Sequence, residues 1–337
     1  MKTVYFSADL PSYKANLHCH TTCSDGKLTP EQIKEAYLAH GYSIVAYSDH
    51  NVLIDHSDLN DEKFLAMLAT EYNVHKPGDR HPAFLPTYHI NFYPRRSHQV
   101  TVPCYTPGAF SRADLLAVQP HTGEDYVRSY DGVQDMIDRF NAAGFITMIN
   151  HPTWSLQTAA DFLRLHGFFA IELYNHGCAS VGFDEYNTAI WDQLLRAGMP
   201  VYGTATDDNH NGAPLDDPAN DSFGGFTVIQ AAALTQEAVV EALEAGHFYA
   251  STGPLFRSIE LEDDILKVEC SPVEKILLTT GHRQARITYP EPGEEALTCA
   301  EFDLHSIKAN DYVRLTLVDA EGRFAWSQPI RDYIGKE

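Results

Sequence analysis

Residues 15–26 read ANLHCHTTCSDG, a short apolar run that ends in two histidines and continues into a turn. An apolar run of this length predicts a buried strand over residues 15–20. Because side chains alternate along a strand, His18 and His20 lie on one face and Cys19 on the other. Histidine is the commonest metal ligand in proteins, so the pair predicts one wall of a metal site.

Further apolar runs follow along the chain, separated by segments with the end signals of helices. Thr29-Pro30-Glu31 is expected to begin a helix that Gly41 ends, and Asp131 to cap one that stops at Gly144. Strands and helices that alternate at this spacing predict parallel strands joined by crossovers, and their number suits a barrel. Two more helices are expected to end at Gly198 and to run from Thr235 to Gly246. The expected strands span residues 15–20, 43–50, 64–71, 88–92, 145–150, 170–174, 201–206 and 226–230.

The expected secondary structure changes at two points along the chain. Residues 73–130 are rich in loops and prolines, as expected of an insertion that covers a site. After residue 255 only short strands and turns are expected. We therefore predict a barrel over residues 1–255, including the insertion, and a small all-β domain over residues 256–337. The expected strands of this second domain are 256–264, 265–270, 275–280, 284–289, 300–304 and 312–319.

Candidate metal ligands gather where the predicted strands end. In a parallel barrel, the carboxyl ends of the strands meet at one face, which is where sites are built. A lone histidine at a strand end is more often structural, but a whole series of such residues favours a shared site. The series comprises His18, His20, Asp49, His50, Glu71, His89, His151, Asp207, Asp208 and His210.

These motifs resemble the PHP (polymerase and histidinol phosphatase) superfamily over residues 14–255. The resemblance is carried by His18-x-His20 with Ser24-Asp25-Gly26, by Ser48-Asp49-His50, by Glu71, by Asn150-His151-Pro152 and by Asp207-Asp208-x-His210. Residues 246–254 and 312–329 further resemble the CehA/McbA-like branch of metallohydrolases. The superfamily implies a distorted (β/α)7 barrel that holds two or three divalent metal ions, here Zn, Mn or Fe.

The resemblance also implies which residues share each ion. One ion takes His18, His20, Glu71 and Asp207; a second shares Glu71 and adds His89 and His151; a third takes Asp25, His50 and His210. The superfamily's usual Asp-x-His spelling favours Asp208 instead of Asp207. We expect Asp207 to be the ligand, Asp208 to act as an acid or beside the third ion, and Asp49 to orient His50 or a neighbouring ligand.

Other polar residues near the predicted site have two interpretations each. Glu172 and Asn175 face either the cleft or solvent at the end of their strand. Arg95, Arg96 and Arg80 in the insertion are candidates to clamp a phosphate, although loop arginines are usually solvated. His176 is a candidate substrate contact.

Composition narrows the class of protein. The chain has 337 residues and a net charge of −22, which opposes binding to nucleic acid or to anionic membranes. No apolar run is long enough to span a membrane, and the start lacks a secretory signal. The six cysteines lack zinc-ribbon spacing and are expected to be reduced thiols of a cytoplasmic protein.

Clustered metals predict a metal-dependent hydrolase of a small-molecule substrate. The first hypothesis is a phosphoesterase that uses a metal-activated hydroxide on a phosphorylated metabolite or nucleotide. The second is a carbamate, ester or amide hydrolase of the CehA/McbA type. The third is a metal-holding protein that binds a partner without catalysis. Basic groups in the pocket favour a phosphorylated substrate; an aromatic lining from Phe92, Tyr93, Trp154 or Tyr174 favours a neutral ester.

Overall fold

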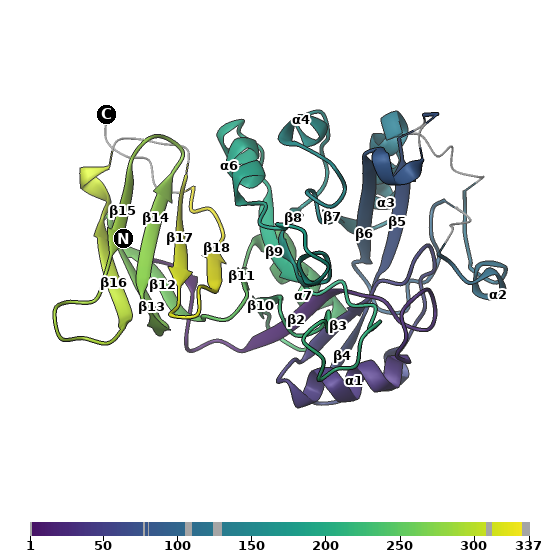
Figure 1. Ribbon diagram of the computed structural model, residues 1–337, viewed down its shortest axis with the longest axis horizontal. Coiled ribbons are helices and arrows are strands. Elements are labelled where there is room, and N and C mark those ends of the chain that lie inside the picture. Colours follow the sequence, from purple (N-terminus) through teal and green to yellow (C-terminus); the bar gives the residue numbers. More distant parts are fainter. Residues whose placement is uncertain are drawn as a thin grey trace.

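The computed structural model describes residues 2–76, 78–79, 81–104, 110–123, 130–307 and 312–331. The described residues form a mixed α/β fold with three sheets, and helices lie along the outside of the strands (Figure 1). The sheets have nine, five and four strands. Two of them hold the predicted ligands between them.

The nine-stranded sheet contains the first parallel strands of the chain. Here β2 (Ser12–Cys19) pairs with β3 (Ile44–Tyr47), and β3 pairs with β4 (Leu65–Leu68), all in parallel. Helix α1 (Pro30–Ala39) is the crossover between β2 and β3. On its other side β2 pairs with β10 (Phe226–Gln230), which runs antiparallel to it.

The five-stranded sheet departs from the predicted all-parallel order. β6 (Thr87–Pro94) runs antiparallel to both of its neighbours, β5 (Thr70–His75) and β7 (Phe145–Ile149). Parallel pairing returns from β7 to β8 (Ala170–Asn175) and β9 (Tyr202–Thr206). A parallel connection usually runs through a crossover helix, and among the described residues between β5 and β6 only the short 3-10 turn Pro82–Phe84 is helical.

Isolated bridges join these two sheets beside the predicted ligands. Cys19 bridges Asn209, and His50 bridges Glu71, both in parallel. The described strands therefore form two arcs rather than one closed ring of hydrogen-bonded strands, and the predicted (β/α)7 barrel is not confirmed. The arcs still bring the ends of β2, β3, β7 and β9 to one place. The longer helices on the outside are α3 (Val133–Ala142), α6 (Thr188–Arg196) and α7 (Gln236–Ala245).

The predicted helix ends at Thr29, Thr235 and Gly246 are confirmed, and the one at Asp131 is wrong. Thr29 and Gln32 form a reciprocal capping box at α1, and α7 begins after the capping Thr235 and ends at Gly246 with φ +74°. Asp131 does not cap α3, because it lies in a 3-10 turn, and the cap position is Gly132. The short helices are α2 (Ala113–Leu116), α4 (Ala159–Phe162), α5 (His176–Ser180), η1 (Ser57–Leu59), η2 (Pro82–Phe84), η3 (Tyr130–Gly132) and η4 (Leu304–Ser306).

The C-terminal residues form strands, as expected, and the N-terminal strand joins them. β1 (Lys2–Phe6) pairs with β12 (Phe256–Glu262), far away in sequence. β11 (Phe248–Ser251) pairs with both β10 and β18 (Phe324–Ser327), so the nine-stranded sheet runs from one region into the other. The division after residue 255 stays a prediction. The remaining strands are β13 (Ile265–Val273), β14 (Lys275–Thr280), β15 (Ala285–Thr288), β16 (Leu297–Asp303) and β17 (Val313–Val318).

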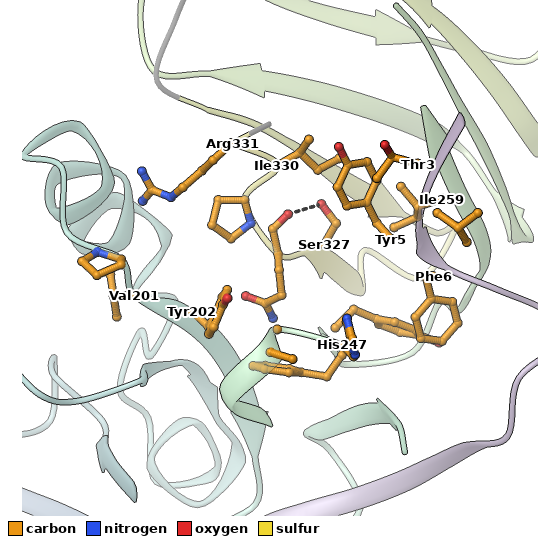
Figure 2. A pocket seen from close by; sticks show the side chains of 18 residues that line it. Thr3, Tyr5, Phe6, Val201, Tyr202, His247, Ile259, Ser327, Ile330 and Arg331 are labelled. Atoms are coloured by element: carbon orange, nitrogen blue, oxygen red, sulfur yellow. Dashed lines mark hydrogen bonds between the residues drawn. The ribbon is translucent and has the colours of Figure 1, made fainter. Parts of the chain in front are cut away.

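A cleft of about 360 Å³ lies where the two regions meet (Figure 2). Tyr202 and His247 line it from one side, and Tyr5 and Ser327 from the other. It contains none of the predicted metal ligands. The candidate site therefore lies elsewhere, between the two arcs.

Two further sequence expectations concern the whole chain. Within the described ranges, no helix combines the length and apolar character needed to cross a bilayer. All six cysteines are free thiols, as expected, and four of them are buried.

Candidate metal centre

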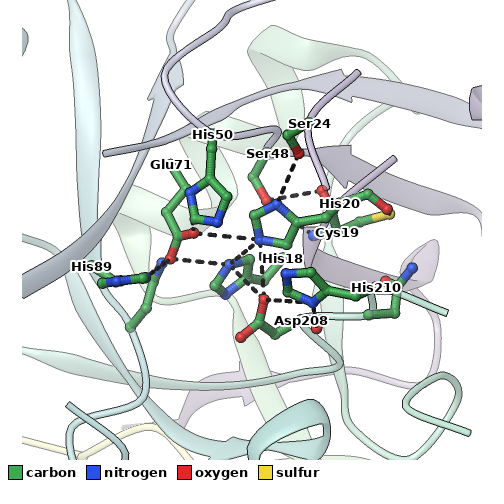
Figure 3. A network of polar contacts seen from close by, with 12 residues as sticks. His18, Cys19, His20, Ser24, Ser48, His50, Glu71, His89, Asp208 and His210 are labelled. Carbon is green, nitrogen blue, oxygen red and sulfur yellow. Dashed lines mark hydrogen bonds and ion pairs between the residues drawn. The ribbon is translucent and has the colours of Figure 1, made fainter. Parts of the chain in front are cut away.

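The two histidines of the opening motif lie between two carboxylates, Glu71 and Asp208, in a buried cluster (Figure 3). Their Nε2 atoms lie 3.2 Å apart. Each also lies 3.1 Å from Asp208 Oδ1 and 3.3 Å from an oxygen of Glu71. His18 and His20 thus share one centre with Asp208 and Glu71.

Glu71 joins this first group to a second one. Its Oε1 lies 3.1 Å from His89 Nδ1 and 3.5 Å from His151 Nε2. The ligand atoms of Glu71, His89 and His151 all lie within 4.8 Å of one another. Glu71 therefore belongs to two of the groups of candidate ligand atoms.

A third group lies on the other side of His20. Asp25 Oδ1 lies 3.5 Å from His210 Nε2, and Asp25 Oδ2 lies 3.8 Å from His50 Nε2. Gly26 makes the turn possible, because a Cβ there would lie 2.5 Å from the carbonyl oxygen of His20. The structure thus brings together every predicted ligand except Asp207.

The cluster meets two tests of a metal centre. A tetrahedral zinc ion with bonds of about 2.0–2.2 Å separates its ligand atoms by roughly 3.3–3.6 Å, close to the distances in the first group. Buried polar atoms normally have hydrogen-bond partners. Asp25 Oδ1, His50 Nδ1, His89 Nε2 and Asp208 Oδ1 are buried and have none, although they face this cluster.

Charges within the cluster hold the carboxylates ionised. Burial opposes the charge of Glu71, but the facing His89 and His18 outweigh it and keep its pKa well below the usual value. Burial likewise opposes the charged form of His20, but Asp208 and Glu71 raise its pKa to about 10. In His50 burial dominates and lowers the pKa to about 3. Ionised carboxylates beside imidazoles are the donor set that divalent transition metals take.

Glu172 lies behind the ligands and holds two of them. Its Oε1 accepts hydrogen bonds from His18 Nδ1 at 2.8 Å and Thr206 Oγ1 at 2.7 Å. Its Oε2 accepts from the backbone N–H of His151 and from Asn175 Nδ2, both at 2.8 Å. The sequence analysis did not decide whether Glu172 faces the cleft or solvent. Its position inside the apolar strand β8 indicates a buried carboxylate, which the structure shows.

Glu172→Gln is expected to weaken metal binding without unfolding the protein. All four hydrogen-bond partners of Glu172 act as donors. The side-chain NH2 group of a glutamine would therefore face two donors instead of accepting from them, and His18 would lose the contact that orients its ring. Loss of such a partner costs about 10–100-fold in metal affinity. Competition with a chromophoric chelator measures this, with the exposed Glu62→Gln as the matched control. Equal affinities of the two variants would refute this role.

Asp208, rather than the predicted Asp207, lies among the candidate ligands. Asp208 faces His18 and His20, whereas Asp207 points the other way and belongs to none of the ligand groups among the described residues. Asp207 accepts hydrogen bonds from the backbone N–H groups of residues 223, 224 and 225 and from Tyr37 Oη, at 2.8–3.0 Å. Its carboxylate fixes a loop, and the ligand assignment is corrected to Asp208.

Two ligand residues have unusual backbone conformations. φ is +53° at Asp208 and +24° at His151, in the left-handed region that non-glycine residues rarely adopt. Such conformations cost about 1–3 kcal/mol each and cluster at functional sites. The strained backbone supports a role for these two side chains beyond packing.

Asp49 holds the turn after β2 rather than His50. Its Oδ1 accepts from the Thr21 N–H at 2.8 Å and from Ser24 Oγ at 2.6 Å, and its Oδ2 accepts from Thr21 Oγ1 at 2.8 Å. Ser24 Oγ lies 3.4 Å from His20 Nδ1. Asp49 therefore positions the Asp25 turn and, through Ser24, the neighbouring His20, which is the second of the two expected alternatives.

Arg95 and Arg96, two of the predicted substrate arginines, are not at the site. β6 runs antiparallel to β7, which carries Arg95 to the opposite end of the sheet, next to the start of β7. There it pairs with Glu244 at 2.7 Å and donates to the carbonyl oxygen of Phe145. Arg96 follows it and does not line the pocket over the cluster. Arg80 lies outside the described residues.

Arg95→Ala is expected to leave KM and kcat unchanged. The pair with Glu244 is about 40% exposed on each side, and exposed pairs contribute about 0–1 kcal/mol. Steady-state kinetics and thermal unfolding check this together. A severalfold rise in KM would restore Arg95 as a substrate contact.

A pocket of about 480 Å³ opens over the cluster. Its upper walls are Phe110, Trp154, Val181 and Cys178, and no lysine or arginine lines it among the described residues. Trp154 is held by Glu185, which accepts hydrogen bonds from the backbone N–H groups of residues 153 and 154.

Few of the predicted pocket residues reach this space. Only Trp154 of the predicted aromatics lines it, since Phe92 and Tyr93 are buried in the core. Tyr174 bonds to His176 at 3.0 Å, and neither lines the pocket. The sequence missed Phe110 and Val181, whose large exposed side chains carry no local signal of a site.

The chain matches no protein-family model and no curated protein. Among solved structures it is similar to a two-domain protein from Bacteroides vulgatus that contains a predicted PHP-like metal-dependent phosphoesterase. The two are 13% identical, with a TM-score of 0.45, over 95% of this chain and 96% of that one.

Two further solved structures align with the larger part of the chain. One is a candidate metal-dependent phosphoesterase from Bifidobacterium adolescentis, 16% identical with a TM-score of 0.38, over 70% of this chain and 97% of that one. The other is an amidohydrolase from Chromobacterium violaceum with bound sulfate and no metal, 17% identical with a TM-score of 0.38, over 69% and 96%. PHP-like metal-dependent phosphoesterases are thus among the structures that this chain resembles.

Proposed function

We propose that this chain is a PHP-type metal-dependent hydrolase that cleaves a phosphoric ester with a small, largely apolar organic group. The observation that carries the proposal is the set of four overlapping ligand groups in the cluster, two of which share Glu71. On this proposal the two arcs of sheet are a distorted (β/α)7 barrel, with residues 1–255 and 256–337 as its two domains.

The ligand groups assign a role to each residue. His18, His20, Glu71 and Asp208 would hold one ion; Glu71, His89 and His151 a second; Asp25, His50 and His210 a third. When bound, such divalent ions activate water near neutral pH and neutralise the charge of substrate oxygens. Glu172 and Asp49 keep the ligating side chains oriented.

Charge favours a phosphoric ester over an uncharged one. Three divalent cations carry more charge than the three carboxylates Glu71, Asp208 and Asp25 that would hold them. The loaded site would therefore be positive at its base and would attract an anionic phosphate. A phosphate needs no arginine clamp in such a site.

The pocket above selects the organic group. Phe110, Trp154 and Val181 offer apolar contact. A strongly polar group such as a sugar would lose hydrogen bonds to water there without replacement. We therefore expect an aryl or alkyl phosphate rather than a nucleotide.

Hydrolysis of a carbamate, ester or amide is the second candidate function. It is favoured by the same lining, which holds no cationic side chain among the described residues. An uncharged aryl ester would fit these walls as well as an aryl phosphate does. The two candidates therefore differ in the reacting group and not in the organic one.

A panel of 4-nitrophenyl esters separates the candidates, because every member has the same leaving group. The proposal expects the phosphate to be hydrolysed with the highest kcat/KM by metal-loaded protein, and activity to vanish with chelator and return with metal. A higher kcat/KM for the acetate or carbamate would select the second candidate. Inactivity toward every member with metal-replete protein would overturn the hydrolase proposal.

A further inference from the structure

A separate group of metal-ligand atoms lies outside the histidine cluster. Atoms of Cys23, Asp49 and His56 lie within 4.8 Å of one another. Cys23 comes from the turn after β2, Asp49 follows β3, and His56 precedes η1, so three segments converge. Cys23 and His56 are partly exposed, which leaves a path from solvent, and Asp49 is buried.

The ring of His56 is held in place with a free nitrogen. Nε2 is buried and has no hydrogen-bond partner, a costly state for a polar atom. The ring packs on Tyr47 at a centroid distance of 5.0 Å, which limits its movement. A cation bound to this nitrogen would replace the missing partner.

Asp49 retains room for a cation. Oδ1 accepts two hydrogen bonds, but Oδ2 accepts only one within the described part of the chain, from Thr21 Oγ1. A carboxylate oxygen has lone pairs for about two partners. Oδ2 therefore has a lone pair available.

The local charge also favours a cation. The carboxylates of Asp49, Asp58, Glu31 and Asp55 all act on the ring of His56. Arg112 is a cation that acts on Cys23, and it already pairs with Asp114 at 2.6 Å. Several negative charges thus act on this group, and the positive charge of Arg112 is already paired.

We propose that Cys23, Asp49 and His56 bind a thiophilic divalent cation of the zinc class. Zinc takes thiolate, imidazole and carboxylate ligands, and three protein ligands leave a fourth position for water. On binding, the thiol proton of Cys23 passes to solvent and the thiolate becomes the ligand. Because Asp49 also holds Ser24, this cation would brace the turn that carries Asp25.

Cobalt substitution tests the proposal, because a cobalt–thiolate bond gives a charge-transfer absorption in the near ultraviolet that imidazole and carboxylate ligands do not give. Full-length metal-depleted protein titrated with Co²⁺ should develop this band, and Zn²⁺ should remove it. Cys23→Ser should lose the band and bind one ion fewer. Cys178→Ser is the matched control and should keep the band, although Cys178 lines the other pocket.

His56→Gln gives an independent test in a protein that keeps its thiol. The Co²⁺ concentration that gives half of the band should rise by about 10-fold or more, because even the loss of a residue that only supports a ligand costs that much in metal affinity. An absent band in wild type, an unchanged band in Cys23→Ser, or its loss in Cys178→Ser would overturn the proposal. The readout is independent of turnover, so the hydrolase proposal stands or fails separately.

Discussion

Glu71→Gln is expected to abolish turnover and to remove at least one bound metal ion per chain. Glu71 is 1% exposed and faces four histidines, with His18, His20, His50 and His89 all within 3.3 Å of its oxygens. An amide would leave one ligand oxygen where the centre needs two. The loss in metal affinity should exceed the roughly 10–100-fold cost of losing a residue behind the ligands.

Elemental analysis after dialysis at fixed free metal measures this loss, and kcat/KM is measured alongside. Glu244→Gln is the matched control, because its carboxylate lies at the far end of the sheet in the exposed pair with Arg95. The control should keep both metal and activity. Wild-type metal content in Glu71→Gln would contradict the bridging role.

Asp208→Asn and Asp207→Asn are expected to fail in opposite ways. Asp208→Asn should keep its fold, since asparagine tolerates the left-handed backbone at this position, but should lose metal and more than about 100-fold in turnover. Asp207→Asn should keep its ligands and lose about 1–3 kcal/mol of unfolding free energy, because its amide would face backbone N–H donors.

Denaturant unfolding and metal content per folded chain, measured for both variants, distinguish the two roles. The loop that donates to Asp207 is tightly packed, because a Cβ at Gly225 would lie 2.2 Å from the carbonyl oxygen of Thr206. The loop therefore has little freedom to adjust to the Asp207→Asn change. If Asp207→Asn loses metal while Asp208→Asn retains it, the roles assigned here are reversed.

Most of the centre was predictable from sequence because its ligands follow a simple rule. His18, His50 and His151 come at or directly after short apolar runs, and the ends of parallel strands meet. Glu71 was placed at the end of one predicted strand, although the structure divides that run into β4 and β5. These side chains still come together in the structure, because their meeting depends on the order of the strands and not on the exact residues at which the strands end.

The rule that ligands follow strand ends does not say which of Asp207 and Asp208 faces the cluster. Successive side chains of an extended segment point to opposite faces. Which of the two adjacent aspartates faces the site depends on whether the chain leaves β9 with a side chain pointing toward the site or away from it. The sequence alone does not determine this. The loop at residues 223–225 that selects Asp207 is far away in sequence.

Arg95 illustrates a second limit, the direction of a strand. An apolar run predicts a strand without its polarity, and the expected parallel order placed the insertion above the site. Because β6 runs antiparallel, its C-terminal end lies at the opposite edge, while His89 in its interior still reaches the cluster. Arg95 lies away from the cluster for this reason, whereas His89 lies within it.

Anomalous diffraction from crystals of the full chain grown with Mn²⁺ tests the central claim most directly. The account predicts at least two anomalous peaks inside the cluster, one between His18, His20 and Asp208 and one beside His89 and His151. A carboxylate oxygen of Glu71 should contact both. Peaks confined to other parts of the molecule, or peaks in the cluster that Glu71 does not touch, would contradict it.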